Sequence, residues 1–183
     1  MKQAGYRQYE ISNFAQPGYA CRHNIGYWTR ENYLGLGLGA SSLVENVRYT
    51  NTRQLYAYGE FCDHLQEKSP AEFLKDGEHA VPEDLWIGSC VQEQAQILTR
   101  KEQMEEFMFL GLRMTDGVSA RRFYEEFGES LEIIYAAAID KLVKEGLLVR
   151  VEKGTDGRED TWFRLTDFGI DVSNYALSEF LFD

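Results

Sequence analysis

Glycine alternates with leucine in one segment of the chain, and this segment constrains the fold more than any other. Residues 33–44 read Tyr-Leu-Gly-Leu-Gly-Leu-Gly-Ala-Ser-Ser-Leu-Val, with three glycines within five positions. Each glycine costs about 1 kcal/mol in a helix interior relative to alanine, so a helix is excluded here. We expect a strand that runs into a Gly-rich loop. The glycines let the backbone approach either a ligand, such as an adenine, ribose or phosphate, or a closely packed neighbouring strand, and both interpretations stay open.

The residues on either side of this segment also indicate β structure. Tyr6–Ser12 alternates larger apolar and polar side chains, which predicts a strand with one buried face. Pro17-Gly18 predicts a turn after it. A short strand is expected over Val47–Thr50, and Thr52 is expected to cap a helix that runs to about residue 66.

The second half of the chain is expected to be mainly helical. Thr99 and Glu102 have the spacing of a capping box, which opens a helix to about Arg113. Ser119 is expected to cap a second helix that Gly128 ends. The first of these helices carries one apolar stripe: Met104, Phe107, Met108 and Leu112.

The last fifty residues complete a recognisable order of elements. Leu131–Lys144 predicts one helix, and residues 147–151 and 161–165 predict a hairpin. Thr166 is expected to cap a final helix with Tyr175, Leu177 and Phe180 turned inward. Helix, helix, hairpin and helix in this order are typical of a winged-helix-like domain. A strand is expected over Val91–Leu98, after an acidic connection over 67–90.

The charge distribution makes a nucleic-acid partner a poor explanation of this order. The chain carries a net charge of −11, and its first 65 residues hold six basic and five acidic side chains, so the acidity lies in the remainder. DNA binding needs clustered Lys and Arg, whereas the expected hairpin tip holds Asp156, Glu159 and Asp160. The helix expected over Leu131–Lys144, which would be the recognition helix, offers only Lys141 and Lys144. We therefore expect no nucleic-acid partner, and a free-standing winged-helix regulator is retained only as an alternative.

The three cysteines, Cys21, Cys62 and Cys90, are 41 and 28 residues apart. They form neither a disulfide framework nor a thiolate cluster, and the reducing cytoplasm is the expected compartment. His64 and His79 have no second ligand at metal spacing, so we interpret both as solvent-facing. No apolar run approaches the roughly 20 residues of a membrane span.

The densest polar and aromatic cluster is Cys21-Arg22-His23-Asn24-Ile25-Gly26-Tyr27-Trp28. The imidazole of His23 suits a transition metal or haem iron. Tyr27 and Trp28 could form flat walls beside a porphyrin, and Arg22 could pair with a propionate. From spacing alone, a hydrogen-bonded structural histidine is the more common explanation of such a cluster.

Several blocks in sequence resemble the oxygen-independent coproporphyrinogen III oxidase-like radical SAM family. They are Tyr9–Gly18, Arg22–Trp28, the Gly-rich segment with Gly39-Ala40-Ser41, and Asn51-Thr52, followed by Glu105–Arg113. The HNxxYW block, with His23, Asn24, Tyr27 and Trp28, is similar to the haem chaperone (HemW) branch rather than to the oxidases. The resemblance spans nearly the whole chain, and 67–90 is its least matched part.

The resemblance implies an α+β fold with three parts. Residues 1–66 would be the closing strands of a partial (β/α) radical SAM barrel, 67–98 an acidic connector with a strand near its end, and 99–183 a helical, winged-helix-like C-terminal domain. It implies that His23 is the ligand of the haem iron, with Arg22, Asn24, Tyr27 and Trp28 as the other haem-binding residues. It also implies that Ala15 and Leu43 contact S-adenosylmethionine.

The chain departs from the family in one large respect. Family members hold a [4Fe–4S] cluster with CxxxCxxC, and this chain has no such motif. We therefore expect a C-terminal portion of a longer protein, inactive in radical chemistry alone, with S-adenosylmethionine and the cluster belonging to the full-length parent. The expected partners are haem or porphyrin, a haem acceptor of unknown identity, and the missing N-terminal barrel portion. The alternative parent is a coproporphyrinogen III oxidase, which decarboxylates two propionates oxidatively in porphyrin biosynthesis.

Overall fold

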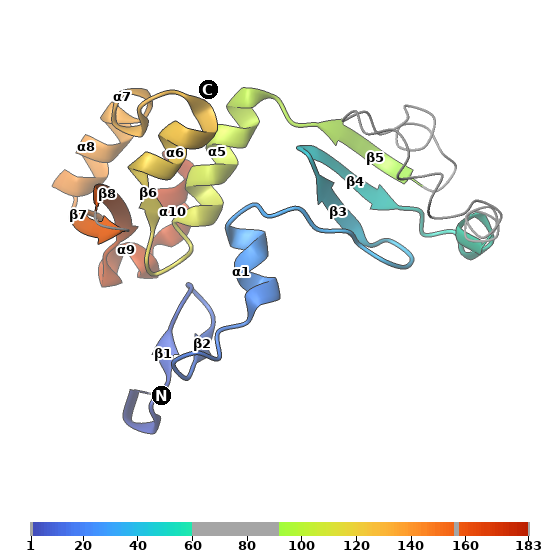
Figure 1. Ribbon diagram of the computed structural model, residues 1–183, viewed down its shortest axis with the longest axis horizontal. Coiled ribbons are helices and arrows are strands. Elements are labelled where there is room, and N and C mark those ends of the chain that lie inside the picture. The colour runs from blue at the N-terminus through green and yellow to red at the C-terminus, as the bar shows by residue number, and fades with distance from the viewer. Residues whose placement is uncertain (1, 60–91, 156–157, 183) are drawn as a thin grey trace. The chain divides into compact units, whose positions relative to one another are not determined.

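The structure is a computed structural model that describes residues 2–59, 92–155 and 158–182 (Figure 1). Helices and strands both contribute, as the expected α+β class requires. The chain forms two compact units: one joins Met1–Glu31 with Thr99–Asp183, and the other is Asn32–Leu98. These units are defined by compactness, whereas the domains expected from sequence (1–66, 67–98 and 99–183) are defined by family resemblance. The expected domain boundaries therefore stay a prediction.

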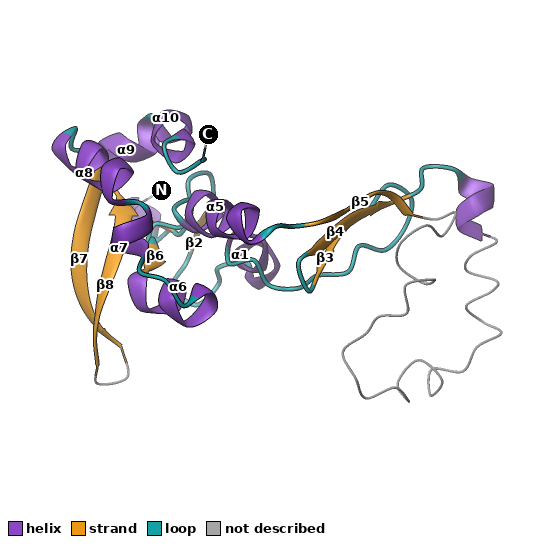
Figure 2. Ribbon diagram, turned by 90° about the horizontal axis from the view of Figure 1, so that it is seen from above, coloured by secondary structure: helices purple, strands orange, loops and turns teal. Residues whose placement is uncertain are grey.

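The unit Asn32–Leu98 is built on a three-stranded antiparallel sheet, coloured orange in Figure 2. Its strands are β3 (Ser41–Val44), β4 (Val47–Asn51) and β5 (Gln92–Ile97), in the order β3-β4-β5. A two-residue turn joins β3 and β4, with positive φ at both Glu45 and Asn46, as a right-twisted hairpin favours. The strand expected at 47–50 is therefore confirmed, and the strand expected at 91–98 is confirmed over Gln92–Ile97.

The Gly-rich segment is a loop over 34–40, and no helix forms in it. The expected strand before the loop is reduced to a single bridge between Tyr33 and Leu43, and the regular strand follows the loop instead. The cap expected at Thr52 is wrong: its hydroxyl accepts from the amide of Gln54, and the helix begins at residue 55. The later part of that helix and the 67–90 connection lie outside the described residues.

The other unit begins with a 3₁₀ turn, η1 (Lys2–Ala4), and a minimal hairpin of β1 (Arg7–Gln8) and β2 (Phe14–Ala15). The strand expected over 6–12 is therefore wrong in length, because β1 has only two residues. The chain bends after Glu10 because its Oε1 accepts from the Ser12 amide at 2.9 Å and from Asn13 Nδ2 at 2.6 Å. Pro17-Gly18 forms the expected turn. A short helix that no pattern predicted, α1 (Arg22–Trp28), follows.

The helical half opens as expected. Helix α5 (Arg100–Gly111) starts at Thr99, which accepts from the Glu102 amide while Glu102 Oε2 accepts from the Thr99 amide at 2.7 Å. After β6 (Val118–Ser119), Ser119 caps α6 (Ala120–Phe127), and Gly128 ends it with φ +66°. The capping signals therefore predicted both helices with their ends.

The single helix expected over 131–144 is wrong. It is divided into α7 (Leu131–Ile134) and α8 (Ala136–Lys144) by Tyr135, which has φ −109° and ψ 22°. The ring of Tyr135 packs edge-on against Phe123 and Phe180. Core packing of this ring therefore overrides the continuous helical pattern around it.

The hairpin is longer than expected, with β7 (Leu148–Thr155) and β8 (Arg158–Leu165), and β6 extends it to a sheet of order β6-β8-β7. The last helix is also divided, into α9 (Asp167–Asp171), which Thr166 caps, and α10 (Ser173–Ser178). Leu177 and Phe180 are buried as expected, but Tyr175 is exposed because its hydroxyl pairs with Glu145.

This helical unit encloses one cluster of buried apolar side chains from α5, α6, the sheet and the final helices, among them Met108, Leu112, Phe123, Leu142, Phe163 and Phe180. Among the described residues, no helix has the length and apolar character needed to cross a bilayer.

Candidate functional site

Helix α1 carries all five residues that the sequence grouped around His23. It is a seven-residue helix with no buried residue, and it leads into Arg30 in the left-handed region (φ +58°). Arg30 fixes the end of α1 to the helical core: its Nε lies 3.3 Å from Glu106 on α5, and its Nη1 lies 2.7 Å from Glu126 on α6. No sequence pattern pointed to Arg30, since its partners lie 76 and 96 residues away.

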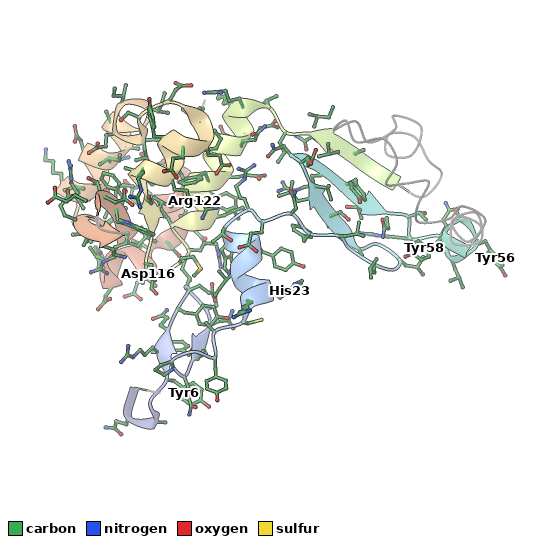
Figure 3. All side chains as sticks on the ribbon, viewed as in Figure 1. Tyr6, His23, Tyr56, Tyr58, Asp116 and Arg122 are labelled. Carbon is green, nitrogen blue, oxygen red and sulfur yellow. The ribbon has the colours of Figure 1, made fainter. Side chains whose placement is uncertain are left out.

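His23 and Tyr27 are brought together on the outer face of α1 (Figure 3 labels His23). The Tyr27 hydroxyl lies 3.0 Å from His23 Nε2, and the two rings meet edge-to-face with centroids 4.7 Å apart. Both side chains are exposed, so water or a ligand can reach the imidazole. This i, i+4 pair is the geometry in which helix neighbours contact each other.

Trp28 lies on a different face of the helix. Its ring packs under the guanidinium of Arg113, with Cζ 4.4 Å from the ring centroid. Arg113 in turn approaches the fully buried Glu10 at 3.9 Å. Trp28 therefore takes part in packing within its own unit, and its expected role as a porphyrin wall stays a prediction.

The remaining two residues of the cluster differ in burial. Arg22 is exposed at the first position of α1. Asn24 is half-buried, and its Oδ1 accepts no hydrogen bond from the described residues. An exposed cation beside an exposed imidazole matches the chemistry of haem, which presents an iron atom and ionised propionates.

The two residues expected at S-adenosylmethionine belong to different compact units. Ala15 is half-buried in β2, opposite Arg7. Leu43 is buried in β3, and its amide and carbonyl both pair with the backbone of Tyr33, at 3.0 and 2.8 Å. Leu43 thus offers a ligand neither a free amide nor a free carbonyl.

The Gly-rich loop uses its own amides internally. The amide of Gly35 donates to Ser42 Oγ at 2.9 Å, that of Gly37 to the Tyr58 hydroxyl at 2.8 Å, and that of Gly39 to the carbonyl of Thr52 at 3.1 Å. Asn51 Nδ2 donates to the carbonyls of Gly35 and Gly37, at 3.0 Å each. A Cβ on Gly35 would overlap the Ser41 carbonyl. These contacts favour the close-packing interpretation of the glycines over a phosphate cradle.

The donor set does not fit an iron–sulfur cluster. Across the described ranges, no group of three or more His, Cys, Asp or Glu side chains could hold a metal ion. Cys21 is exposed and unpaired as a disulfide, while Cys62, Cys90, His64 and His79 lie outside the described residues.

Comparison with known proteins agrees with this picture. Residues 98–172 match the family HemN C-terminal domain. "Heme chaperone HemW" of Lactococcus lactis is 33% identical over 98% of the chain, and that of Bacillus subtilis is 36% identical over 81%. The chain spans 38% and 33% of the length of these two relatives.

The fold has a counterpart among solved structures. Coproporphyrinogen III oxidase (HemN) from Escherichia coli, described as a radical SAM enzyme, superposes with a TM-score of 0.58 at 14% identity, over 98% of this chain and 38% of that one. At this identity the likeness is one of fold. The chain belongs to the coproporphyrinogen III oxidase-like radical SAM family, to which these two heme chaperones are similar, and it corresponds to their C-terminal portion.

Proposed function

We propose that this chain is the haem-binding portion of a haem-chaperone-type radical SAM protein, with haem as its cargo. His23 would ligate the iron, Tyr27 would lie beside the ring, and Arg22 would pair with a propionate. The observation that carries the proposal is the exposed imidazole of His23, held on a helix that the core fixes through Arg30. The names of the relatives support it, since they are heme chaperones.

The Tyr27 hydroxyl gives the proposal a specific consequence. Iron needs an unprotonated imidazole nitrogen, and the hydroxyl lies 3.0 Å from Nε2. Coordination through Nε2 therefore has to displace this hydrogen bond, which costs about 1 kcal/mol. Tyr27→Phe keeps the ring and removes the competitor, so it should tighten hemin binding by up to about fivefold, whereas Tyr27→Ala should weaken it.

Hemin titration followed at the Soret band tests the assignment. We expect the full chain to form a hexacoordinate or pentacoordinate histidine spectrum, and His23→Ala to lose it. His64→Ala and His79→Ala are the matched controls, because the chain has three histidines in all. Equal spectra for the full chain and His23→Ala would overturn the ligand assignment.

The S-adenosylmethionine pocket and the haem acceptor belong to the longer parent in this proposal. S-Adenosylmethionine with its cluster would supply the radical chemistry there, and Ala15 and Leu43 would contribute only apolar contacts. Leu43 suits this limited role, since its side chain is buried and its backbone is paired. We propose the haem chaperone rather than the oxidase as the parent because the relatives identical at 33% and 36% bear that name.

We further propose that α6, α7 with α8, and the β7–β8 hairpin form a winged-helix-like module that contacts protein and not DNA. Lys141, one of two lysines on α8, is already paired with Glu179 at 2.8 Å. Asp160, which the sequence placed at an acidic wing tip, is buried against the start of α6. Salt-sensitive binding to duplex DNA at micromolar concentration would contradict this assignment.

A further inference from the structure

Helix α1 presents two faces, and only one of them holds the proposed iron ligand. His23 and Tyr27 are exposed on the outer face, whereas Asn24 and Trp28 are half-buried on the other. Both pairs have the i, i+4 spacing of side chains that share a helix face. Consecutive residues are about 100° apart around the helix axis, so whatever fixes the direction of Trp28 also fixes the direction of His23.

The contacts at the end of α1 do not by themselves fix its rotation about its own axis. Thr29 and Arg30, which contact α5 and α6, both follow the last helical residue and set where the helix ends. The helix itself has seven residues, none of them buried, and no side-chain cap. Its rotational position therefore depends on the contacts of its half-buried face.

On that face, the ring of Trp28 lies against one cation. Arg113, which follows α5 in the same compact unit, has its Cζ 4.4 Å from the ring centroid. Cation–π contacts are effective within about 6 Å of the centroid, and tryptophan gives the strongest of them. The contact forms only while the indole faces Arg113, so it favours one rotational position of α1 over the others.

Arg113 is itself held through both its backbone and its side chain. Its amide donates to the carbonyl of Leu110 at 3.1 Å, and its carbonyl accepts from the amide of Ile11 at 3.0 Å. Its Nη2 lies 3.9 Å from Glu10 Oε2, and Glu10 is 0% exposed. A buried carboxylate needs a cation beside it, and Glu10 makes no other ion pair within the described ranges. The negative charge of Glu10 therefore holds the guanidinium in place.

The pair between Arg113 and Glu10 is an ion pair without a hydrogen bond. Its distance of 3.9 Å exceeds hydrogen-bond length, and Arg113 Nε and Glu10 Oε2 are both buried without a hydrogen-bond partner among the described residues. The guanidinium is thus shared between the carboxylate and the indole. Loss of the indole would leave the ion pair intact, whereas loss of Arg113 alone would leave a buried charge uncompensated. Trp28 can therefore be changed with less risk to folding than Arg113.

We propose that Arg113 is a positioning residue for haem binding and that it acts through Trp28 on His23. Glu10 holds the guanidinium, the guanidinium holds the indole, and the indole keeps the imidazole on the exposed face of α1. This inference rests on the proposed function, because it concerns the imidazole that would ligate the iron. It gives Trp28 a different role from the porphyrin wall expected from sequence: a wall contacts the haem directly, whereas a positioning residue acts only through the ligand.

Hemin titration at the Soret band, with urea unfolding of every variant, tests this role. Trp28→Leu removes the ring that Arg113 contacts, so it should weaken hemin binding about tenfold, because the competent orientation of α1 becomes less populated. Trp28→Phe keeps a ring for the cation and should weaken binding less than about threefold. Lys153→Met is the matched control and should leave hemin binding unchanged, because Lys153 Nζ also lies 4.4 Å from an indole centroid, that of Trp162 on β8.

A paired variant tests Arg113 without leaving a buried charge alone. Glu10→Gln with Arg113→Met removes both charges together, and glutamine keeps an acceptor oxygen for the turn that follows residue 10. This variant should weaken hemin binding about as much as Trp28→Leu does. Adding Trp28→Leu to it should weaken binding little further, since both changes break the same contact.

Substitution of His23 separates positioning from direct contact with haem. In the His23→Ala background, Trp28→Leu should leave the residual hemin affinity unchanged, because its effect passes through the imidazole. A porphyrin wall, or a general loss of structure, would weaken hemin binding further in that background.

Two results would each overturn the positioning role. The first is hemin binding by Trp28→Leu that equals binding by the unaltered chain. The second is an equal loss of affinity from Trp28→Leu with His23 present and with His23→Ala. If the urea curve shows that Trp28→Leu does not fold, the paired variant decides by the same two comparisons. Failure of the proposed function is a separate result, since equal spectra for the unaltered chain and His23→Ala would overturn both proposals.

Discussion

The start of α6 is held by a chain of two hydrogen bonds, one buried and one half-buried, and breaking this chain should cost more than losing an ordinary helix cap. Asp160 Oδ2 accepts from the Ser119 hydroxyl at 2.6 Å, and Ser119 Oγ accepts from the Arg122 amide at 2.9 Å. Ser119 and Asp160 are only 5% and 4% exposed. The carboxylate also accepts from the Arg121 amide at 3.2 Å, and negative charge at a helix N-terminus is favourable.

These contacts allow an estimate of how much free energy of unfolding each substitution removes. Losing the cap costs about 1 kcal/mol, and losing one hydrogen bond to a buried charged group costs about 2 kcal/mol. Ser119→Ala should therefore lower the free energy of unfolding by about 3 kcal/mol, which is roughly 6–12 °C in Tm for a chain of this size. Asp160→Ala should cost a similar amount. Because the two share one bond, the double variant should cost about 2 kcal/mol less than the sum.

Urea unfolding followed by tryptophan fluorescence measures all four members of this cycle, and Trp162 lies two residues from Asp160 on β8. Ser130→Ala is the matched control: Ser130 stands at the N-cap of α7 but makes no capping hydrogen bond with its side chain, so it should cost less than about 0.5 kcal/mol. A coupling energy below about 0.5 kcal/mol, or an equal cost for Ser130→Ala, would refute the reasoning.

Two further predictions concern glycine and tyrosine. Gly117→Ala should lower the free energy of unfolding by about 3 kcal/mol or more in the same urea assay, because φ is +80° and a Cβ would overlap the Phe163 carbonyl. Gly128→Ala, at φ +66° in open space, should cost only about 1 kcal/mol. Burial, with the nearby Glu105 carboxylate second, raises the pKa of Tyr135 above its ordinary value of 10.0. The penalty for ionising the buried hydroxyl is therefore absent below pH 10, and the free energy of unfolding falls as the pH rises above it. Tyr135→Phe should be neutral or stabilising at pH 7, because the buried hydroxyl has no partner among the described residues, and should reduce the loss measured by thermal unfolding above pH 10.

The elements that sequence predicted well are those whose signals are local. The capping box at Thr99, the cap at Ser119 and the stop at Gly128 each act within four residues, so their types and spacing suffice. The apolar stripe of α5 is likewise a local period, and Met104, Phe107, Met108 and Leu112 are all buried.

The elements that sequence missed depend on contacts across the chain. Tyr135 divides the expected helix because its ring enters the core between Phe123 and Phe180. Asp160 looks like a solvated hairpin tip in sequence, yet the hairpin is longer than expected and buries this carboxylate at α6. The partners of Tyr135 and Asp160 lie too far away in sequence for a helical or strand pattern of neighbouring residues to reveal them.

The candidate site also combines features that local sequence patterns predict with features that depend on distant contacts. The residue types of the HNxxYW block pointed to His23 and Tyr27, and the structure pairs them. Trp28 belongs to the same block, but Arg113, 85 positions later, decides where its ring lies. No sequence pattern indicated the neighbours of Trp28 in the fold, since the pocket that it lines is assembled from α1, α5, α6 and β8.

Helix α1 itself depends on the domain that follows it. Isolated helices shorter than about 12–15 residues are marginal in water, and α1 has seven residues, a glycine in its middle and no capping side chain. What holds it are contacts at its end, where Arg30 meets Glu106 and Glu126, and Arg122 donates to Thr29. The imidazole of His23 is therefore positioned by the helical C-terminal domain, although it lies far from that domain in sequence. If haem is taken up at His23, the geometry of the iron ligand is set by residues on α5 and α6, and substitutions there should alter hemin affinity without touching the ligand.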